Sequence, residues 1–264
     1  MAEVTRKHIK NRVSFLETKV PRYASYLGVA AILAVWEFIC RMGWVAPLFL
    51  PAPTRIVVAL WELFTQGGMI KDVGASLYRI VLGYALGASV GIIIGLLLGF
   101  SRWMEALGTP IIYSLYPIPK IALLPLIVLW LGIGELPKVA IIALGVFFPV
   151  VINTFSGVKN VDPTLVKAAV TFGSNHVNVI RKVLLPGSLP VIFAGLKLAA
   201  GTSLLLLVAA EMIAASEGVG SMVLHYGNLM LTDKLMAGVV VLSLLGLAFN
   251  RLLQWVENRL LPWK

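Results

Sequence analysis

Residues 77–100 read LYRIVLGYALGASVGIIIGLLLGF, an apolar run. A segment of about 20 mainly apolar residues can cross the roughly 30 Å of hydrocarbon in a bilayer as a helix. Within the run, glycine recurs every four residues, at Gly83, Gly87, Gly91, Gly95 and Gly99. Because an α-helix has about 3.6 residues per turn, these glycines share one slowly turning face, where another helix can approach closely. The run therefore predicts a transmembrane helix with a tight packing seam; a sliding surface used in gating is the alternative.

The composition of the whole chain also indicates a membrane protein. Of its 264 residues, 59% are hydrophobic and 13% are charged, and its mean hydropathy is +0.92. Soluble domains carry about 25% charged residues, so lipid must solvate much of this chain. The net charge of +10 does not indicate nucleic acid, because many of the basic residues precede the first apolar run or follow the last one. That distribution is typical of membrane orientation with the basic side in the cytoplasm.

Further apolar runs predict an all-α membrane protein of about six transmembrane helices. The predicted spans cover residues of about 23–40, 77–100, 107–131, 136–155, 187–214 and 234–255. Prolines at 110, 117, 119 and 125 break the third run, which lipid tolerates only where neighbours satisfy the freed backbone groups. Segment 41–76 is predicted to lie outside the membrane with one short amphipathic helix, and segment 215–233 to be a short loop.

The basic N-terminus fixes the expected topology. Six spans place both termini on one side, and the positive charge places that side in the cytoplasm. Residues 1–22 are then a cytoplasmic segment, and residues 23–264 form a single membrane domain with a cytoplasmic loop at about 156–186. Segments 41–76, 132–136 and 215–233 are predicted to be external, and they hold fewer Lys and Arg residues than the cytoplasmic segments.

Several classes of site are not expected in this chain. Cys40 is the only cysteine, so an intrachain disulfide is excluded. His8, His176 and His225 have no acidic or thiolate partners at the spacing of metal ligands, so no metal site is predicted. The chain holds no G-x-x-x-x-G-K-[ST] phosphate loop, so it should bind neither ATP nor another cofactor itself. A membrane-embedded enzyme would need a cluster of His, Asp or Ser residues at one depth, and none is visible.

The loop at 162–186 reads DPTLVKAAVTFGSNHVNVIRKVLLP. Leu165 and Phe172 belong to one apolar stripe at helical spacing, and Val177 and Leu184 to a second. Gly173 lies between the stripes and can adopt the positive φ that ends a helix. Pro186 closes the second stripe at the start of the next span, where a helix accepts proline. The loop therefore predicts two short amphipathic helices, which either rest on lipid headgroups or dock onto a partner protein.

The spacing in this loop resembles the EAA loop of ABC importer permeases. Ala168-Ala169 is followed four residues later by Gly173, then by nine residues and Val183-Leu184-Leu185-Pro186. Lys167 stands where the family pattern has glutamate, and Val183 stands where it has isoleucine. The resemblance implies contact with a cytoplasmic ATPase subunit through Lys167, Ala168, Ala169, Gly173, Val183, Leu185 and Pro186.

Four further segments are similar to permeases of the sulfonate, taurine, nitrate and bicarbonate branch of that family. They are LFLPAPTRIV (48–57), YPIPKIALLPLIVLWLGIGELPKV (116–139), VAAEMIAASEGVG (208–220) and LLPWK (260–264). The resemblance implies a type I ABC importer permease fold in the bacterial inner membrane, present as a homodimer. It also implies an ATPase partner that binds ATP and Mg, and an external substrate-binding protein. The implied solute is a small anion, with an organosulfonate such as an alkanesulfonate or taurine first; nitrate, bicarbonate or a small organic nutrient stays open.

Ionisable groups at membrane depth are costly and are therefore candidates for the solute pathway. Those in this chain are Lys120, Lys197 and Glu211, with Glu37 near the end of the first span. Polar groups close to the proline-rich break or within the fourth span add Tyr113, Tyr116 and Asn153. A structural role is the plainer interpretation of each. A stand-alone secondary transporter driven by an ion gradient is the alternative function, although it usually has paired broken helices, and only one proline-broken region is visible.

Overall fold

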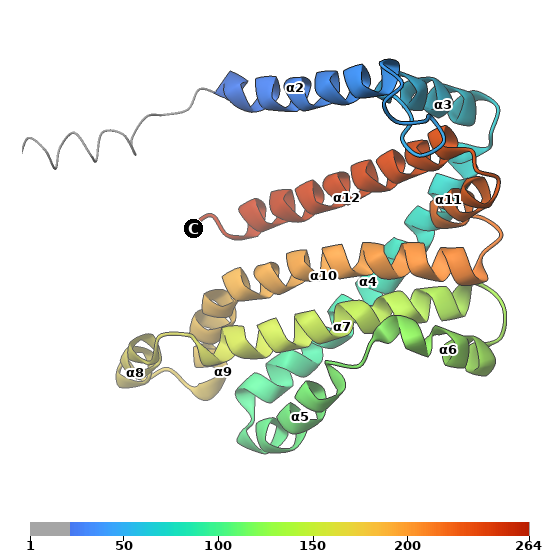
Figure 1. The fold of residues 1–264 in the computed structure, drawn as a ribbon. Coiled ribbons are helices and arrows are strands. Elements are labelled where there is room, and N and C mark those ends of the chain that lie inside the picture. Colours follow the sequence, from blue (N-terminus) through green and yellow to red (C-terminus); the bar gives the residue numbers. More distant parts are fainter. Residues whose placement is uncertain (1–21, 264) are drawn as a thin grey trace, which may run out of the picture.

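The computed structural model describes residues 22–263, and the side chains from Tyr26 onward. The predicted cytoplasmic segment therefore lies outside the described residues, apart from Arg22. The described part is helical and contains no strand, and Figure 1 shows its elements in chain order. They are α2 (Arg22–Arg41), α3 (Pro53–Thr65), α4 (Met69–Phe100), α5 (Arg102–Leu115), the 3₁₀ turn η1 (Lys120–Leu123), α6 (Leu124–Leu131), α7 (Glu135–Lys159), α8 (Pro163–Thr171), α9 (His176–Val179), the π-helical turn η2 (Ile180–Leu184), α10 (Leu185–Ala214), α11 (Val219–Asn228) and α12 (Thr232–Leu260).

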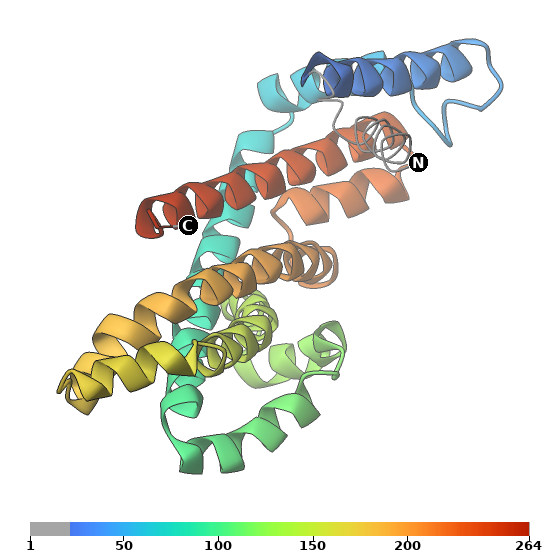
Figure 2. The ribbon, with the colours of Figure 1, turned by 90° about the vertical axis from the view of Figure 1, so that its left-hand side faces the viewer.

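The long helices lie so that their ends form two groups. In Figure 1, α3, α6 and α11 lie at one end, and α8, α9 and the carboxyl end of α12 lie at the other. These two ends are called the α11 end and the α8 end below. Figure 2, turned by 90°, shows that α4 crosses α10 and α12, whereas it stays in contact with α7 from Gly83 to Gly99.

Four helices in the described part are long and apolar enough to cross a membrane. They are Met69–Phe100, Glu135–Lys159, His176–Ala214 and Thr232–Leu260; the bent pair Arg102–Leu115 and Lys120–Leu131 makes a fifth if it is counted as one span. The all-helical membrane fold is therefore confirmed, with four or five spans. The first predicted span, 23–40, corresponds to α2, which is not among these helices, and it stays a prediction.

The glycine face of α4 lies directly against α7, and these two helices form the most extensive helix pair in the described chain. A Cβ atom added to Gly87 would lie 2.3 Å from the carbonyl oxygen of Ala143. At Gly95 it would lie 2.5 Å from the Cβ of Thr154. Each of the five glycines has α7 atoms within 3.0 Å of such a Cβ, so a larger residue would force the helices apart.

The same seam has a regular partner row on α7. The atoms nearest to Gly83, Gly87, Gly91 and Gly95 include the carbonyl oxygens of four α7 residues that are also spaced by four. These residues are Val139, Ala143, Phe147 and Val151. Beside the seam, buried Ile80, Ile142, Val146 and Leu207 form the core between α4, α7 and α10. The α4–α7 pair with α10 is thus the packed centre of the fold.

Three predicted boundaries differ from the structure. Segment 215–233 contains the helix α11 and is not only a short loop, and α4 begins at Met69, ahead of the predicted start of the second span at about 77. The two elements meet here, because Asp72 near the start of α4 accepts a hydrogen bond from the Gly218 N–H before α11, at 2.8 Å. The third predicted span also begins later, at about 107, than the helix α5, which starts at Arg102 with the Ser101 hydroxyl capping it.

The predicted place of Pro186 at the start of the fifth span is confirmed, but the second loop helix does not end there. The segment from His176 to Ala214 forms one continuous helix, with a π-helical turn at Ile180–Leu184. Pro186 lies in the first turn of α10, directly after this turn. Proline has no N–H to donate to the helix, so a regular α-helix would lack one backbone hydrogen bond at Pro186. The π-helical turn before it changes the hydrogen-bond pattern at this point, and the helix continues.

Candidate functional site

The loop at the α8 end is built by two capped helices joined at a glycine. The Asp162 carboxylate accepts a hydrogen bond from the Thr164 N–H at 2.8 Å, which caps the start of α8. The backbone and side-chain hydrogen bonds from Thr164 lower the pKa of the Asp162 carboxyl below its ordinary value. Asn175 caps α9 in the same way, accepting from the Asn178 N–H at 2.9 Å. The two helices predicted for this loop are therefore present, with polar caps encoded in the sequence.

Gly173 ends α8 with a positive φ of 79°. The Ser174 N–H reaches the carbonyl of Ala169 at 3.0 Å and the Gly173 N–H reaches the carbonyl of Val170 at 2.9 Å. This pair of bonds is the Schellman arrangement, which favours glycine at the left-handed position. The Schellman turn reverses the chain between α8 and α9, and Figure 1 shows α8 lying beyond the ends of the long helices α7 and α10.

The surface of this loop is apolar and cationic. Phe172 is 89% exposed, and Leu165, Val170 and Val177 are exposed as well. Lys167, Ala168 and Gly173 are exposed, while Ala169, Val183, Leu185 and Pro186 are partly buried. Among the described residues, the exposed Lys167, Arg181 and Lys182 form no ion pair. This face therefore offers apolar side chains and free positive charge to whatever covers it.

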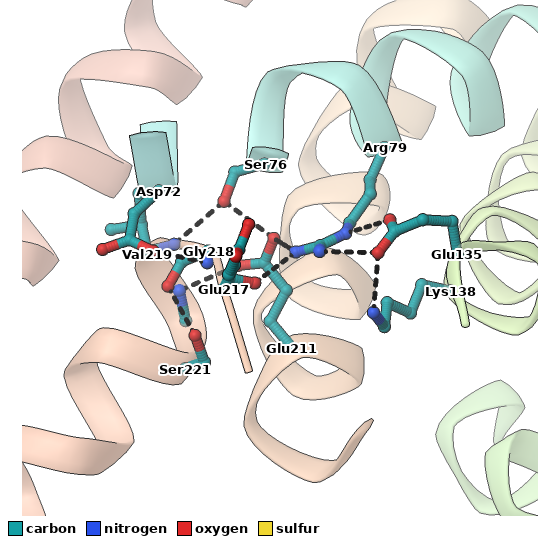
Figure 3. A network of polar contacts seen from close by, with 11 residues as sticks. Asp72, Ser76, Arg79, Glu135, Lys138, Glu211, Glu217, Gly218, Val219 and Ser221 are labelled. Carbon is teal, nitrogen blue, oxygen red and sulfur yellow. Dashed lines mark hydrogen bonds and ion pairs between the residues drawn. The ribbon is translucent and has the colours of Figure 1, made fainter. Parts of the chain in front are cut away.

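A buried charge network occupies the α11 end (Figure 3). The Arg79 guanidinium from α4 bonds Glu211 of α10 through Nη1 at 2.7 Å. The same group holds both oxygens of Glu135 of α7, at 2.5 and 2.9 Å, and Lys138 also pairs with Glu135 at 2.9 Å. Arg79 is 3% exposed and Glu211 is 0% exposed. The network therefore joins three long helices, with Arg79 and Glu211 buried and Glu135 reaching the surface.

Glu211 is satisfied by the protein itself. Besides Arg79, it accepts from the Ser76 hydroxyl at 2.7 Å and from the Gly220 N–H at 2.8 Å (Figure 3). The Ser76 hydroxyl in turn accepts from the Val219 N–H at 3.0 Å. At Gly218, where φ is 124°, an added Cβ would lie 2.5 Å from the Glu211 carboxyl carbon. The start of α11 is thus held by α4 and α10, and Glu211, a predicted pathway residue, has this structural task.

A cavity of about 310 Å³ lies where the proline-rich break meets the middle of α7 and α10. Tyr116, Pro119 and Lys120 line it from the break, and Phe148 and Thr202 line it from α7 and α10. The Lys120 ammonium lies 4.4 Å from the centre of the Phe148 ring and 5.1 Å from that of Tyr116. It also donates to the carbonyls of Tyr116 and Leu115, the latter at 3.4 Å. A cation therefore faces a largely apolar cavity.

The other predicted pathway residues do not join this cavity. Lys197 forms an ion pair with Glu257 of α12. Asn153 donates to the carbonyl of Pro149 at 2.8 Å and packs against Gly195 of α10. Tyr113 is exposed on α5. The structure thus brings together Tyr116 and Lys120, and leaves Tyr113, Asn153, Lys197 and Glu211 apart from them.

Sequence reasoning did not identify Arg79, although its signal was present. It is a charged residue inside a long apolar run, and such a residue requires a buried partner. Glu37, the remaining ionisable candidate, pairs with Arg41 at 2.7 Å and accepts from Thr54. No group of three His, Cys, Asp or Glu residues in the described part could hold a metal ion.

Residues 87–262 match the family described as "Binding-protein-dependent transport system inner membrane component", and the chain belongs to that family. A chain of the MetNI methionine ABC transporter, in inward-facing conformations, matches with a TM-score of 0.59 over 75% of this chain and 96% of its own, at 21% identity. That match shows the fold, and the predicted ABC importer permease fold is confirmed.

Individual relatives are similar over most of the chain. A protein of Bacillus subtilis named as an aliphatic sulfonates transport permease is 38% identical over 89% of this chain and 85% of its own length. The taurine transport system permease protein of Escherichia coli is 35% identical over 89% of this chain and 87% of its own length.

Proposed function

We propose that this chain is the permease subunit of an ABC importer, and that a separate ATPase drives it through the loop at 162–186. The observation that carries this proposal is the exposed α8–Gly173–α9 element at one end of the bundle. Its apolar and cationic side chains are not covered by the other described residues. The absence of a phosphate loop from the sequence agrees with this division of labour, because ATP and Mg would then be bound by the partner.

The distribution of charge supports a cytoplasmic α8 end in a bacterial inner membrane. Lys167, Arg181 and Lys182 are exposed there, and cytoplasmic segments carry an excess of Lys and Arg. At the α11 end, Lys71 pairs with Glu217 and Lys138 pairs with Glu135, and among the described residues there the exposed Arg55 forms no ion pair. Both termini then lie in the cytoplasm, and a soluble binding protein would deliver solute at the α11 end.

An anion with an organic tail is the proposed solute. Relatives at 35–38% identity carry names that refer to aliphatic sulfonates and to taurine. The cavity suits such a molecule, because it has one cation and a largely apolar wall. Nitrate, bicarbonate or another small nutrient would leave most of that apolar wall without a matching surface.

A second copy of the chain would complete the pathway. The face beside the cavity exposes large apolar side chains: Leu205 is 73% exposed, Trp130 70% and Leu129 78%. Leu205 also lines the cavity itself. If two copies meet at this face, the cavity lies next to their interface, as a shared pathway requires.

Copurification with the ATPase tests the proposal. Gly173→Val strains the turn at φ 79°, and Gly43→Val imposes a similar strain at φ 71° outside the loop, with open space around it. We expect Gly173→Val to lose the ATPase and solute-stimulated ATP hydrolysis, and Gly43→Val to keep both. An ATPase that stays bound to Gly173→Val with unchanged stimulation contradicts the coupling role. Solute uptake that persists with an inactive ATPase favours a secondary transporter instead.

A further inference from the structure

The cavity beside the proline-rich break holds a cation that is not neutralised by the protein. Among the described residues, Lys120 forms no ion pair, whereas Lys197 pairs with Glu257 and Arg79 pairs with two glutamates. An ionised group at membrane depth is expensive unless it has a partner or meets water, and such groups default to a functional role. Of these three cations, Lys120 is therefore the one that a negatively charged ligand would stabilise most.

The depth of Lys120 follows from its neighbours. Phe148 lies near the middle of α7 (Glu135–Lys159), and Thr202 lies in the interior of α10 (Leu185–Ala214). The chain can place a lysine here because the helix of the third span is broken, with a bend of 86° between Arg102–Leu115 and Lys120–Leu131. A broken helix is tolerated at this depth where it lines a cavity.

The local contacts hold the ammonium but leave it incomplete. Its donors reach the carbonyls of Tyr116 and, at 3.4 Å, Leu115, at the carboxyl end of α5. A lysine ammonium has three N–H donors, so one is left for a ligand. The rings of Tyr116 and Phe148 lie against the ammonium and hold the side chain at the cavity wall.

We infer that Lys120 binds the sulfonate head of the solute during its passage, while the apolar wall of the same cavity takes the carbon tail. This inference rests on the proposed function, and it assigns a binding site within it. The cavity of about 310 Å³ is in the size range of small-molecule sites. A single lysine contact, not a cluster of cations, suits a site that must release its ligand again.

Uptake by the complete transporter in proteoliposomes tests this assignment. Taurine and ethanesulfonate are the probes, with Lys120→Gln, Lys120→Arg and, as a matched control, Lys71→Gln. Lys71 is a lysine at the α11 end whose ion pair with Glu217 is exposed. We expect Lys120→Gln to lower the uptake of both probes by about tenfold, the loss expected for one charged hydrogen bond. Lys120→Arg and Lys71→Gln should keep most of the uptake.

A merely structural role of Lys120, as a cap for α5, predicts a different pattern. A structural role predicts that Lys120→Gln lowers the melting temperature and the solute-free ATP hydrolysis. The proposed binding role predicts that both stay unchanged. Equal uptake by Lys120→Gln and the unchanged protein overturns the assignment while leaving the proposed function standing. If the unchanged protein imports neither probe, the sulfonate solute class of the proposed function fails, and the assignment fails with it.

Thiol chemistry gives a direct measure of occupancy. Cys40 is the only cysteine, so Lys120→Cys in a Cys40→Ala background carries one reactive thiol. We expect aminoethyl methanethiosulfonate, which restores a cation there, to recover uptake, and sulfonatoethyl methanethiosulfonate not to do so. Taurine should slow the reaction of this thiol several-fold during turnover. A reaction rate that taurine leaves unchanged contradicts a solute site at this position.

Discussion

Arg79 and Glu211 stand 132 positions apart in the sequence and meet in an ion pair of 2.7 Å between Nη1 and Oε1, at 3% and 0% exposure. Ser76 and the Gly220 N–H supply the remaining bonds to Glu211. A buried pair of this kind is sensitive to the loss of one partner, because the remaining charge stays buried without compensation. The pair therefore fixes how α4, α10 and α11 meet at the α11 end.

Arg79→Met should destabilise the protein by roughly 3 to 5 kcal/mol, because it leaves Glu211 buried without its cation. The double variant Arg79→Met with Glu211→Leu should recover part of this loss, since neither charge then remains. Thermal unfolding in detergent measures both. Lys71→Gln, which breaks the exposed pair with Glu217, should leave the melting temperature nearly unchanged, because solvent screens an exposed ion pair. A double variant no more stable than Arg79→Met would contradict this account.

Gly87→Ala should weaken the α4–α7 seam, because its Cβ would lie 2.3 Å from the backbone carbonyl oxygen of Ala143. Overpacking of this kind costs about 1 to 3 kcal/mol. Gly74→Ala in the same helix is the matched control, since an added Cβ there meets nothing within 4 Å. It should be neutral or stabilise by up to about 1 kcal/mol through helix propensity. Equal melting temperatures for the two variants would show that the seam tolerates a methyl group.

The start of α8 should loosen at low pH. The pKa of Asp162 is lowered in the folded loop by its hydrogen bonds from Thr164, so its stabilising effect is complete above the pKa of the unfolded chain. That effect is lost as the pH falls through the lower, folded pKa. Hydrogen exchange at the amides of α8 measures this, and Asp162→Asn should keep the cap while removing the pH dependence. An unchanged pH dependence in Asp162→Asn would assign it to another group.

Lys167→Glu should weaken binding of the proposed ATPase subunit and make the remaining binding rise with added salt. Lys167 is exposed on α8 and has no ion pair among the described residues, so its charge is free to meet an acidic group on a partner. Reversing that charge converts an attraction into a repulsion, which salt screens. Affinity measured at two salt concentrations decides this, with Lys71→Glu at the opposite end as the control. Tighter binding of Lys167→Glu would indicate that the facing surface is basic.

Local patterns predicted the parts of the fold that depend on nearby residues. The apolar runs predicted the long helices, the glycine spacing pointed to a close seam, and Gly173 predicted the turn between α8 and α9. The family assignment followed from the spacing around that turn and is confirmed by the match over residues 87–262.

Long-range contacts explain what the sequence left out. Asp72 belongs to α4 and accepts a hydrogen bond from the Gly218 N–H, 146 positions away, which no local pattern indicates. Glu211 appeared to be a candidate for solute contact, yet Arg79, Ser76 and Gly220 occupy it. Lys120 and Lys197 looked equivalent until α12 supplied Glu257 as a partner for Lys197. The partner of a buried charge cannot be read from its own neighbours in the chain.

The matched rows of glycines on α4 and carbonyl oxygens on α7 restrict how these helices can move. Because both rows repeat every four residues, the next register that fits lies four residues away, which is about 6 Å along the helix axis. Any smaller shift would press the large side chains between the glycines into the α7 backbone. We therefore expect α4 and α7 to act as one stationary strut, and the bent α5–α6 unit to swing against it when the pathway changes the side to which it opens.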